Sequence, residues 1–164
     1  MLLGIGLLSG YAMVQDQISA RLCPEYFTVL HNPIPGLSDP TLTGITWGFL
    51  GSWWGGALLG YGAGIAATAG KKAPLKLKQL VFPMLCVIAF ITVCTALAAF
   101  SAWRHAEVFM LESQASSIEV IAPQHRLPAF VVARYHLVAY ASSVVGSVVC
   151  IVWIAISRAK MSVV

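Results

Sequence analysis

Three ionisable side chains within or beside long apolar runs offer the most chemistry. Arg134 and His136 lie in the run at 129–157, and Asp16 follows an apolar run of 14 residues at the start of the chain. An ionisable residue inside a membrane span is costly and by default indicates a function. His136 could relay a proton, bind a haem iron, or serve as a hydrogen-bonded structural histidine. Arg134 is expected to reach the outer interface or to pair with Asp16 or Glu25, the first of which would join the first helix to the last.

A second candidate set has the side chains of a metal site but lacks its spacing. Cys and His are common zinc and copper ligands. Cys23 and Glu25 are two residues apart and His31 follows six residues later, however, and this spacing matches no closed metal motif. The competing interpretation is a proline-rich cap in which Glu25 pairs with Arg21. A haem is disfavoured, because bis-histidine ligation needs a second histidine at the depth of His136. The weak metal candidates are Cys23, His31, His105 and His125.

The composition indicates an integral membrane protein. Of the 164 residues 59% are hydrophobic and only 10% are charged, whereas soluble domains carry about 25% charged residues. The apolar runs are continuous rather than alternating, which favours helices over a β-barrel. The predicted fold class is all-α: a single membrane domain over 1–164, a four-helix bundle with two extracytoplasmic loops forming a small cap. The predicted spans are about 1–20, 44–69, 79–103 and 129–157. A cleaved signal peptide is the alternative for the first run.

Small residues four apart predict how the helices pack. Residues four apart share a helix face, and small side chains there let two backbones approach closely in lipid. The second predicted span carries two offset glycine stripes, so we expect it to be contacted on two sides. The last span carries a similar pattern of serine and glycine. The predicted packing positions are Gly51, Gly55, Gly56, Gly60, Gly64, Ser143, Gly146 and Ser147.

The charges predict an orientation. The loop from Lys71 to Lys78 and the C-terminal tail are basic and contain no acid. Short loops rich in Lys and Arg stay in the cytosol, so both termini are predicted inside, with 21–43 and 104–128 outside. The acids all fall on the predicted outer side: Asp16, Glu25, Asp39, Glu107, Glu112 and Glu119.

Three stretches carry a family resemblance. ISARLCPEYFT (18–28), DPTL (39–42) and WGFLGSWWGGALLG (47–60) resemble a family of bacterial integral membrane proteins without an established activity. The last helix, from ARYHLVAY onward, is also similar, although Arg-Tyr-His stands where that family usually has Trp-Ala-His. The resemblance implies a membrane protein of the bacterial cytoplasmic membrane and implies no chemistry.

No nucleophile elbow, P-loop, dinucleotide fingerprint, HExxH or CxxC motif is present. The leading interpretation is therefore a non-enzymatic accessory, assembly or structural subunit of a membrane complex, without a cofactor. Its expected partners are lipid, other membrane subunits or further copies of itself, and not nucleic acid. The alternatives are a small oligomeric channel or transporter with Arg134 and His136 along its path, and a redox or metal-binding protein that uses the outer histidines.

Overall fold

The computed structural model describes residues 1–107 and 120–160, and every regular element in these ranges is a helix. The all-helical prediction is thus confirmed. Glu112 and Glu119 of the second outer connection lie outside the described residues. The elements are α1 (Leu2–Leu22), α2 (Glu25–Thr28), α3 (Pro40–Thr68), α4 (Leu77–Arg104), the 3-10 turn η1 (Pro123–His125) and α7 (Arg126–Ala159).

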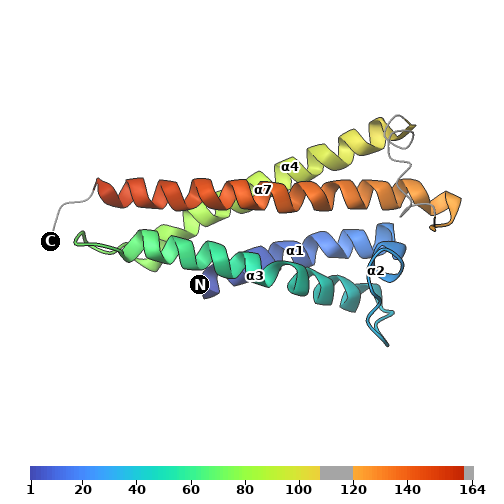
Figure 1. Ribbon diagram of the computed structural model, residues 1–164, viewed down its shortest axis with the longest axis horizontal. Helices are drawn as coiled ribbons and strands as arrows, with labels where there is room; N and C mark the ends of the chain where they lie inside the picture. Colours follow the sequence, from blue (N-terminus) through green and yellow to red (C-terminus); the bar gives the residue numbers. More distant parts are fainter. Residues whose placement is uncertain (108–119, 161–164) are drawn as a thin grey trace.

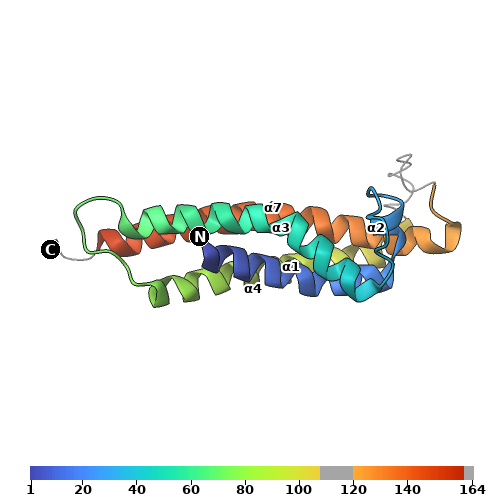
Figure 2. The ribbon, with the colours of Figure 1, turned by 90° about the horizontal axis from the view of Figure 1, so that it is seen from below.

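The four long helices form two antiparallel pairs, which Figure 1 shows along the length of the molecule. Helix α1 packs on α3, and α4 packs on α7, with α3 and α7 in contact between the pairs. Helix α2 lies at one end, while the α3–α4 connection and the end of α7 lie at the other (Figure 2). Residue 1 lies partway along the bundle, against Gly60 of α3.

Glycines let the backbones of α1 and α3 touch. A Cβ atom added to Gly48 would lie within 3 Å of backbone atoms of Met13, and one added to Gly56 would meet the backbone at Gly4. Gly44 and Gly60 make equally close approaches to α1, so these four glycines form one stripe with Ser52 at its centre. Ser52 donates a hydrogen bond to Ser9 across the interface, at 3.1 Å.

The predicted packing positions face different parts of the bundle. Gly56 and Gly60 face α1, Gly51 faces Tyr140 of α7, and Gly55 meets the side chain of Leu8. Gly146 of α7 packs against Val87 and Phe90 of α4. Gly64 differs from the rest, because an added Cβ would have no described atom within 4 Å. Ser143 and Ser147 line a pocket between α1, α3 and α7.

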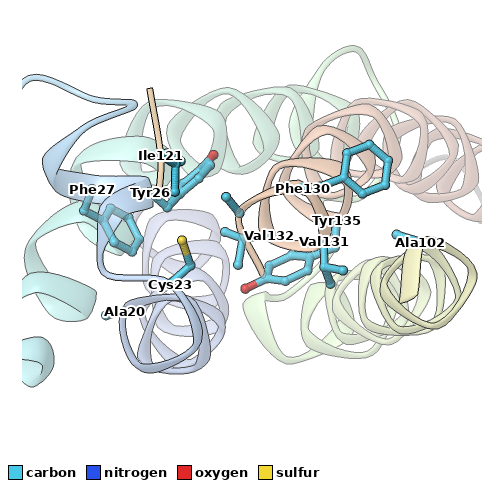
Figure 3. Packing of buried hydrophobic residues seen from close by; sticks show 11 residues of the cluster. Ala20, Cys23, Tyr26, Phe27, Ala102, Ile121, Phe130, Val131, Val132 and Tyr135 are labelled. Carbon is cyan, nitrogen blue, oxygen red and sulfur yellow. The ribbon is translucent and has the colours of Figure 1, made fainter. Parts of the chain in front are cut away.

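The buried apolar residues form two clusters. One lies toward the end with the α3–α4 connection and includes Leu59, Met84, Ile91 and Ile154. The other, shown in Figure 3, joins α2 to α1, α4 and α7 and includes Tyr26, which lies over the end of α1. Because Ile121 belongs to this second cluster, the connection that precedes α7 meets the one that follows α1.

Local signals fix the helix ends around α3. Asp39 is the N-cap and accepts a hydrogen bond from Leu42 N at 2.8 Å, with Pro40 at the first helical position. Asp as N-cap followed by Pro is a strong start signal, so α3 begins four residues before the predicted span at Gly44. At its other end the helix is capped by Arg158 of α7. This buried guanidinium donates to the carbonyl oxygens of Thr68, Ala69, Gly70, Lys72 and Ala73.

Two helical segments in the described ranges, rather than four, are long and apolar enough by length and composition to cross a membrane. They are Leu77–Arg104 and Pro123–Ala159. Helix α1 is less apolar because it includes Gln15, Asp16 and Gln17. Helix α3 has no charged residue, but glycine and tryptophan replace much of the Leu, Ile and Val that raise hydropathy.

Candidate functional site

Helices α1 and α7 bring four polar side chains together in the interior. Asp16 and Ser19 are one turn apart on α1, and Tyr135 and His136 are adjacent on α7. The carboxylate Oδ1 of Asp16 lies 3.2 Å from Nε2 of His136. Ser19 Oγ lies 2.9 Å from the same nitrogen and 2.6 Å from Tyr135 Oη. All four side chains are buried, so their hydrogen bonds replace those that water would supply.

These contacts form a consistent hydrogen-bond network. The Tyr135 hydroxyl donates to Ser19 Oγ, whose own proton can go to the Gln15 carbonyl at 3.2 Å. Nε2 of His136 then carries a proton and donates toward Asp16 and Ser19.

The network is not a Ser-His-Asp triad. In a triad, serine and aspartate contact opposite nitrogens of the imidazole, so that the aspartate orients the ring while the free nitrogen takes the serine proton. Here Ser19 and Asp16 both contact Nε2 of His136. The arrangement can hold and exchange a proton between helices, but it does not prepare Ser19 as a nucleophile.

Aromatic rings cover the network on the side of α2. The Tyr26 ring lies between two imidazoles, with centroids 4.7 Å from that of His31 and 4.7 Å from that of His136. His31 also approaches Trp47 of α3, at 5.2 Å between centroids. The backbone carbonyl of Tyr26 accepts a hydrogen bond from Nδ1 of His31 at 2.7 Å. The CPEYFT segment therefore covers this network through Tyr26.

A pocket of about 330 Å³ lies beside the network, between α1, α3 and α7. Asp16, His136 and Gln15 line one part of it, and its other walls are largely apolar. Gln15 is itself held by Tyr11, whose hydroxyl donates to Gln15 Oε1 at 2.6 Å and lies 3.0 Å from Thr95 Oγ1 of α4. The volume falls in the lower part of the range for small-molecule sites, roughly 300–1,000 Å³.

The candidate metal ligands Cys23 and His125 form a separate pair of contacts. Glu25 bridges the two, since its Oε1 pairs with Nδ1 of His125 and its Oε2 accepts a hydrogen bond from Cys23 Sγ at 3.5 Å. Burial raises the pKa of Glu25, but hydrogen bonds from its own backbone N–H, His125 and Cys23 outweigh that effect and hold the pKa below its ordinary value. Burial raises the pKa of the Cys23 thiol to about 11.

The structure places the remaining predicted residues as follows. Glu25 pairs with His125 and not with Arg21, whose guanidinium donates to Gln17 and Thr41. Arg134 is exposed, whereas the neighbouring His136 is buried. Within residues 1–107 and 120–160, no group of three or more His, Cys, Asp or Glu side chains is placed to hold a metal ion. His31 binds the backbone carbonyl of Tyr26, whereas His125 pairs with Glu25.

Sequence reasoning missed Ser19, Tyr135 and Arg158. Ser19 and Tyr135 had a usable signal, since Ser19 shares a face with Asp16 at a spacing of three residues and Tyr135 adjoins His136. Arg158 was assigned only to the basic tail. Nothing local to Arg158 indicates that it reaches across to the end of another helix.

Fold and site together define an all-helical protein with two segments long enough to cross a membrane and a buried acid–base pair beside a pocket. Comparison with models of protein families, with curated proteins and with solved structures finds no match.

Proposed function

We propose that this chain is an integral membrane protein whose four long helices all cross the bilayer, and that it acts as a non-catalytic subunit of a membrane complex. The supporting observation is the outward surface of the bundle. Soluble monomers rarely expose large continuous apolar patches, yet the outer faces of three helices here are apolar along their length. The exposed residues include Leu50, Trp54, Leu58, Tyr61, Phe82, Phe90, Leu97, Phe100, Val144, Val148 and Val152.

The low hydropathy of α1 and α3 is compatible with insertion because their small and polar residues face inward. The α3 glycines meet the α1 backbone, and Ser52 bonds to Ser9. Asp16 is buried against His136. At a rise of 1.5 Å per residue, the 29 residues of α3 extend about 43 Å, and the 21 residues of α1 about 31 Å, against a hydrocarbon core of about 30 Å.

The two ends of the bundle differ in charge, which supports an orientation. Lys72 and Arg158 lie at the end with the α3–α4 connection, where each donates hydrogen bonds between that connection and α7. Glu25 and His125 lie at the opposite end, beside α2. By the positive-inside rule the lysine-rich end faces the cytosol. The resemblance of the CPEYFT and DPTL segments to a bacterial membrane family agrees with a site in the cytoplasmic membrane.

Two measurements test this proposal. Membranes that contain the protein are first washed with alkaline carbonate, and we expect the protein to stay in the pellet. Purification from native membranes in mild detergent is then expected to bring down one or more membrane proteins at fixed stoichiometry. Recovery in the carbonate supernatant would overturn the membrane assignment. A monomer that is alone after crosslinking in intact membranes would overturn the subunit role.

A second function, proton-linked transport, is favoured by one observation: the Asp16–His136 pair lines the pocket. Such a pair can change protonation as a solute passes. In proteoliposomes, His136→Ala would then abolish solute-driven proton uptake, while Arg134→Ala, a change at an exposed position, would leave it largely intact. No uptake by the unaltered protein under an imposed gradient would count against transport.

A further inference from the structure

We propose that the pocket between α1, α3 and α7 binds a neutral, hydroxyl-bearing, single-chain amphiphile dissolved in the membrane. Its hydroxyl would lie against Gln15 and Asp16, and its chain would leave between α3 and α7. This inference rests on the proposed membrane location and adds a ligand class to it.

The pocket opens toward the surface that would face lipid. Trp54 and Leu58 of α3 and Val144 and Val148 of α7 line it, and all four side chains are exposed. At about 330 Å³ it is small for a membrane lipid, so it holds a head and the first part of a chain while the rest stays in the bilayer. One chain fits such an opening better than the two chains of a phospholipid.

The inner part of the pocket supplies a donor and an acceptor. Among the described residues, Oε1 of Gln15 takes the Tyr11 hydroxyl, while its amide nitrogen has no recorded partner. Similarly, Asp16 contacts Ser19 and His136 through Oδ1, which leaves Oδ2 able to accept. A hydroxyl group both donates and accepts, so it can satisfy Gln15 Nε2 and Asp16 Oδ2 together.

The charge of the site selects a neutral head. Among the described residues no Lys or Arg side chain lines the pocket, and Asp16 and His136 already contact each other, so a charged head would enter without a partner of its own. Burying an unpaired charge costs far more than burying a hydrogen-bonded hydroxyl. Fatty carboxylates and alkylammonium ions should therefore bind much more weakly than an alcohol with the same chain.

Tryptophan quenching in lipid nanodiscs tests this directly. Trp47 lines the pocket and is partly buried, so a protein with Trp47 as its single tryptophan reports occupancy of the pocket. The probes are dodecanol, dodecane and dodecanoate, each labelled with bromine on the chain, because bromine quenches tryptophan on contact. Affinity is expressed as mole fraction in the bilayer, and nanodiscs avoid competition from detergent. The four substitutions are Trp53→Phe, Trp54→Phe, Trp103→Phe and Trp153→Phe.

Bromododecanol is expected to quench Trp47 saturably, and bromododecane and bromododecanoate at least about tenfold more weakly. Gln15→Leu removes one hydrogen bond and should weaken dodecanol about threefold to tenfold, with Gln15→Asn as a second variant that keeps the amide. Ser143→Phe fills the pocket and should abolish saturable quenching, with unchanged helicity as its folding control.

Equal quenching by the three probes, or unchanged saturation in Ser143→Phe, would overturn the ligand assignment. That outcome in nanodisc-embedded protein leaves the membrane proposal standing. Failure of the protein to enter nanodiscs, by contrast, would overturn the membrane proposal and the ligand assignment with it.

Discussion

The contact between α1 and α3 gives the sharpest quantitative test, because two glycines on one helix differ in a single respect. A Cβ at Gly56 would lie 2.6 Å from the Gly4 carbonyl oxygen and 2.7 Å from Ile5 Cα, whereas a Cβ at Gly64 would have no described neighbour within 4 Å. Both residues are inside α3. Gly56→Ala and Gly64→Ala therefore share the same gain in helix propensity and differ only in what the added methyl group meets.

The expected magnitudes follow from this geometry. Replacing glycine by alanine inside a helix favours folding by up to about 1 kcal/mol, so Gly64→Ala should raise the free energy of unfolding by about 0.5–1 kcal/mol. At Gly56, ordinary contact at 3.4 Å requires the helices to separate by about 0.8 Å. Overpacking of this kind costs about 1–3 kcal/mol. The two variants should thus differ by about 1–3 kcal/mol, or about 2–12 °C in Tm for a domain of this size.

Thermal unfolding in detergent micelles can be followed through the buried thiols. Cys23 and Cys150 are 1% and 2% exposed, so a thiol-reactive dye labels them only as the bundle opens. Cys86 and Cys94, which are less buried, are first replaced by alanine. Equal Tm values for Gly56→Ala and Gly64→Ala, or a higher value for Gly56→Ala, would show that the α1 and α3 backbones do not touch at this position.

Three further predictions concern the two ends of the bundle. Arg158→Met leaves the carbonyls at the end of α3 without their donor and should lower the free energy of unfolding by about 1–3 kcal/mol, while Lys160→Met, at an exposed position, should change it little by the same dye assay. The depressed pKa of Glu25 means that its ionised form stabilises the folded state above its unfolded pKa. This contribution should be lost as the pH falls through the lower, folded pKa, so Tm should decline over that acid range in the unaltered protein and less in Glu25→Gln; parallel curves would contradict the pairing. A thiol with a pKa of about 11 is almost entirely protonated at neutral pH, so Cys23 should react with iodoacetamide much more slowly in the folded protein than in the unfolded chain, as mass spectrometry of the labelled peptide would show.

The long helices were predictable because their signal is repeated along the sequence. Each predicted segment matches one long helix to within four residues at either end, and the continuous apolar runs favoured helices over strands. Helix ends were less well predicted: Asp39 and Pro40 are an N-cap signal, yet the span was placed from apolar content, which begins later. Four membrane spans were predicted, but within the described residues only Leu77–Arg104 and Pro123–Ala159 have the length and hydropathy of a membrane span.

The site was predictable only in part because its members belong to different helices. Asp16 and His136 stand out as polar residues in apolar surroundings, but their contact depends on how α1 docks on α7. The sequence suggested Arg134, and not His136, as a partner for Asp16. The geometry brings His136 to it, with Ser19 completing the contact. Which of two nearby polar residues turns inward is set by tertiary packing and leaves no local pattern in the sequence.

The glycines of α3 connect the packing of the bundle with the existence of its pocket. On the side of α1, the space left by the absent side chains is filled by the α1 backbone, because Gly48 and Gly56 lie directly against it. Toward the pocket, Gly51 meets only the end of the Tyr140 side chain of α7, and Gly55 meets only the end of the Leu8 side chain. The same composition therefore closes one interface and leaves space in the other. Because the space adjoins Asp16 and His136, the chain places its buried acid–base pair where a small molecule can reach it.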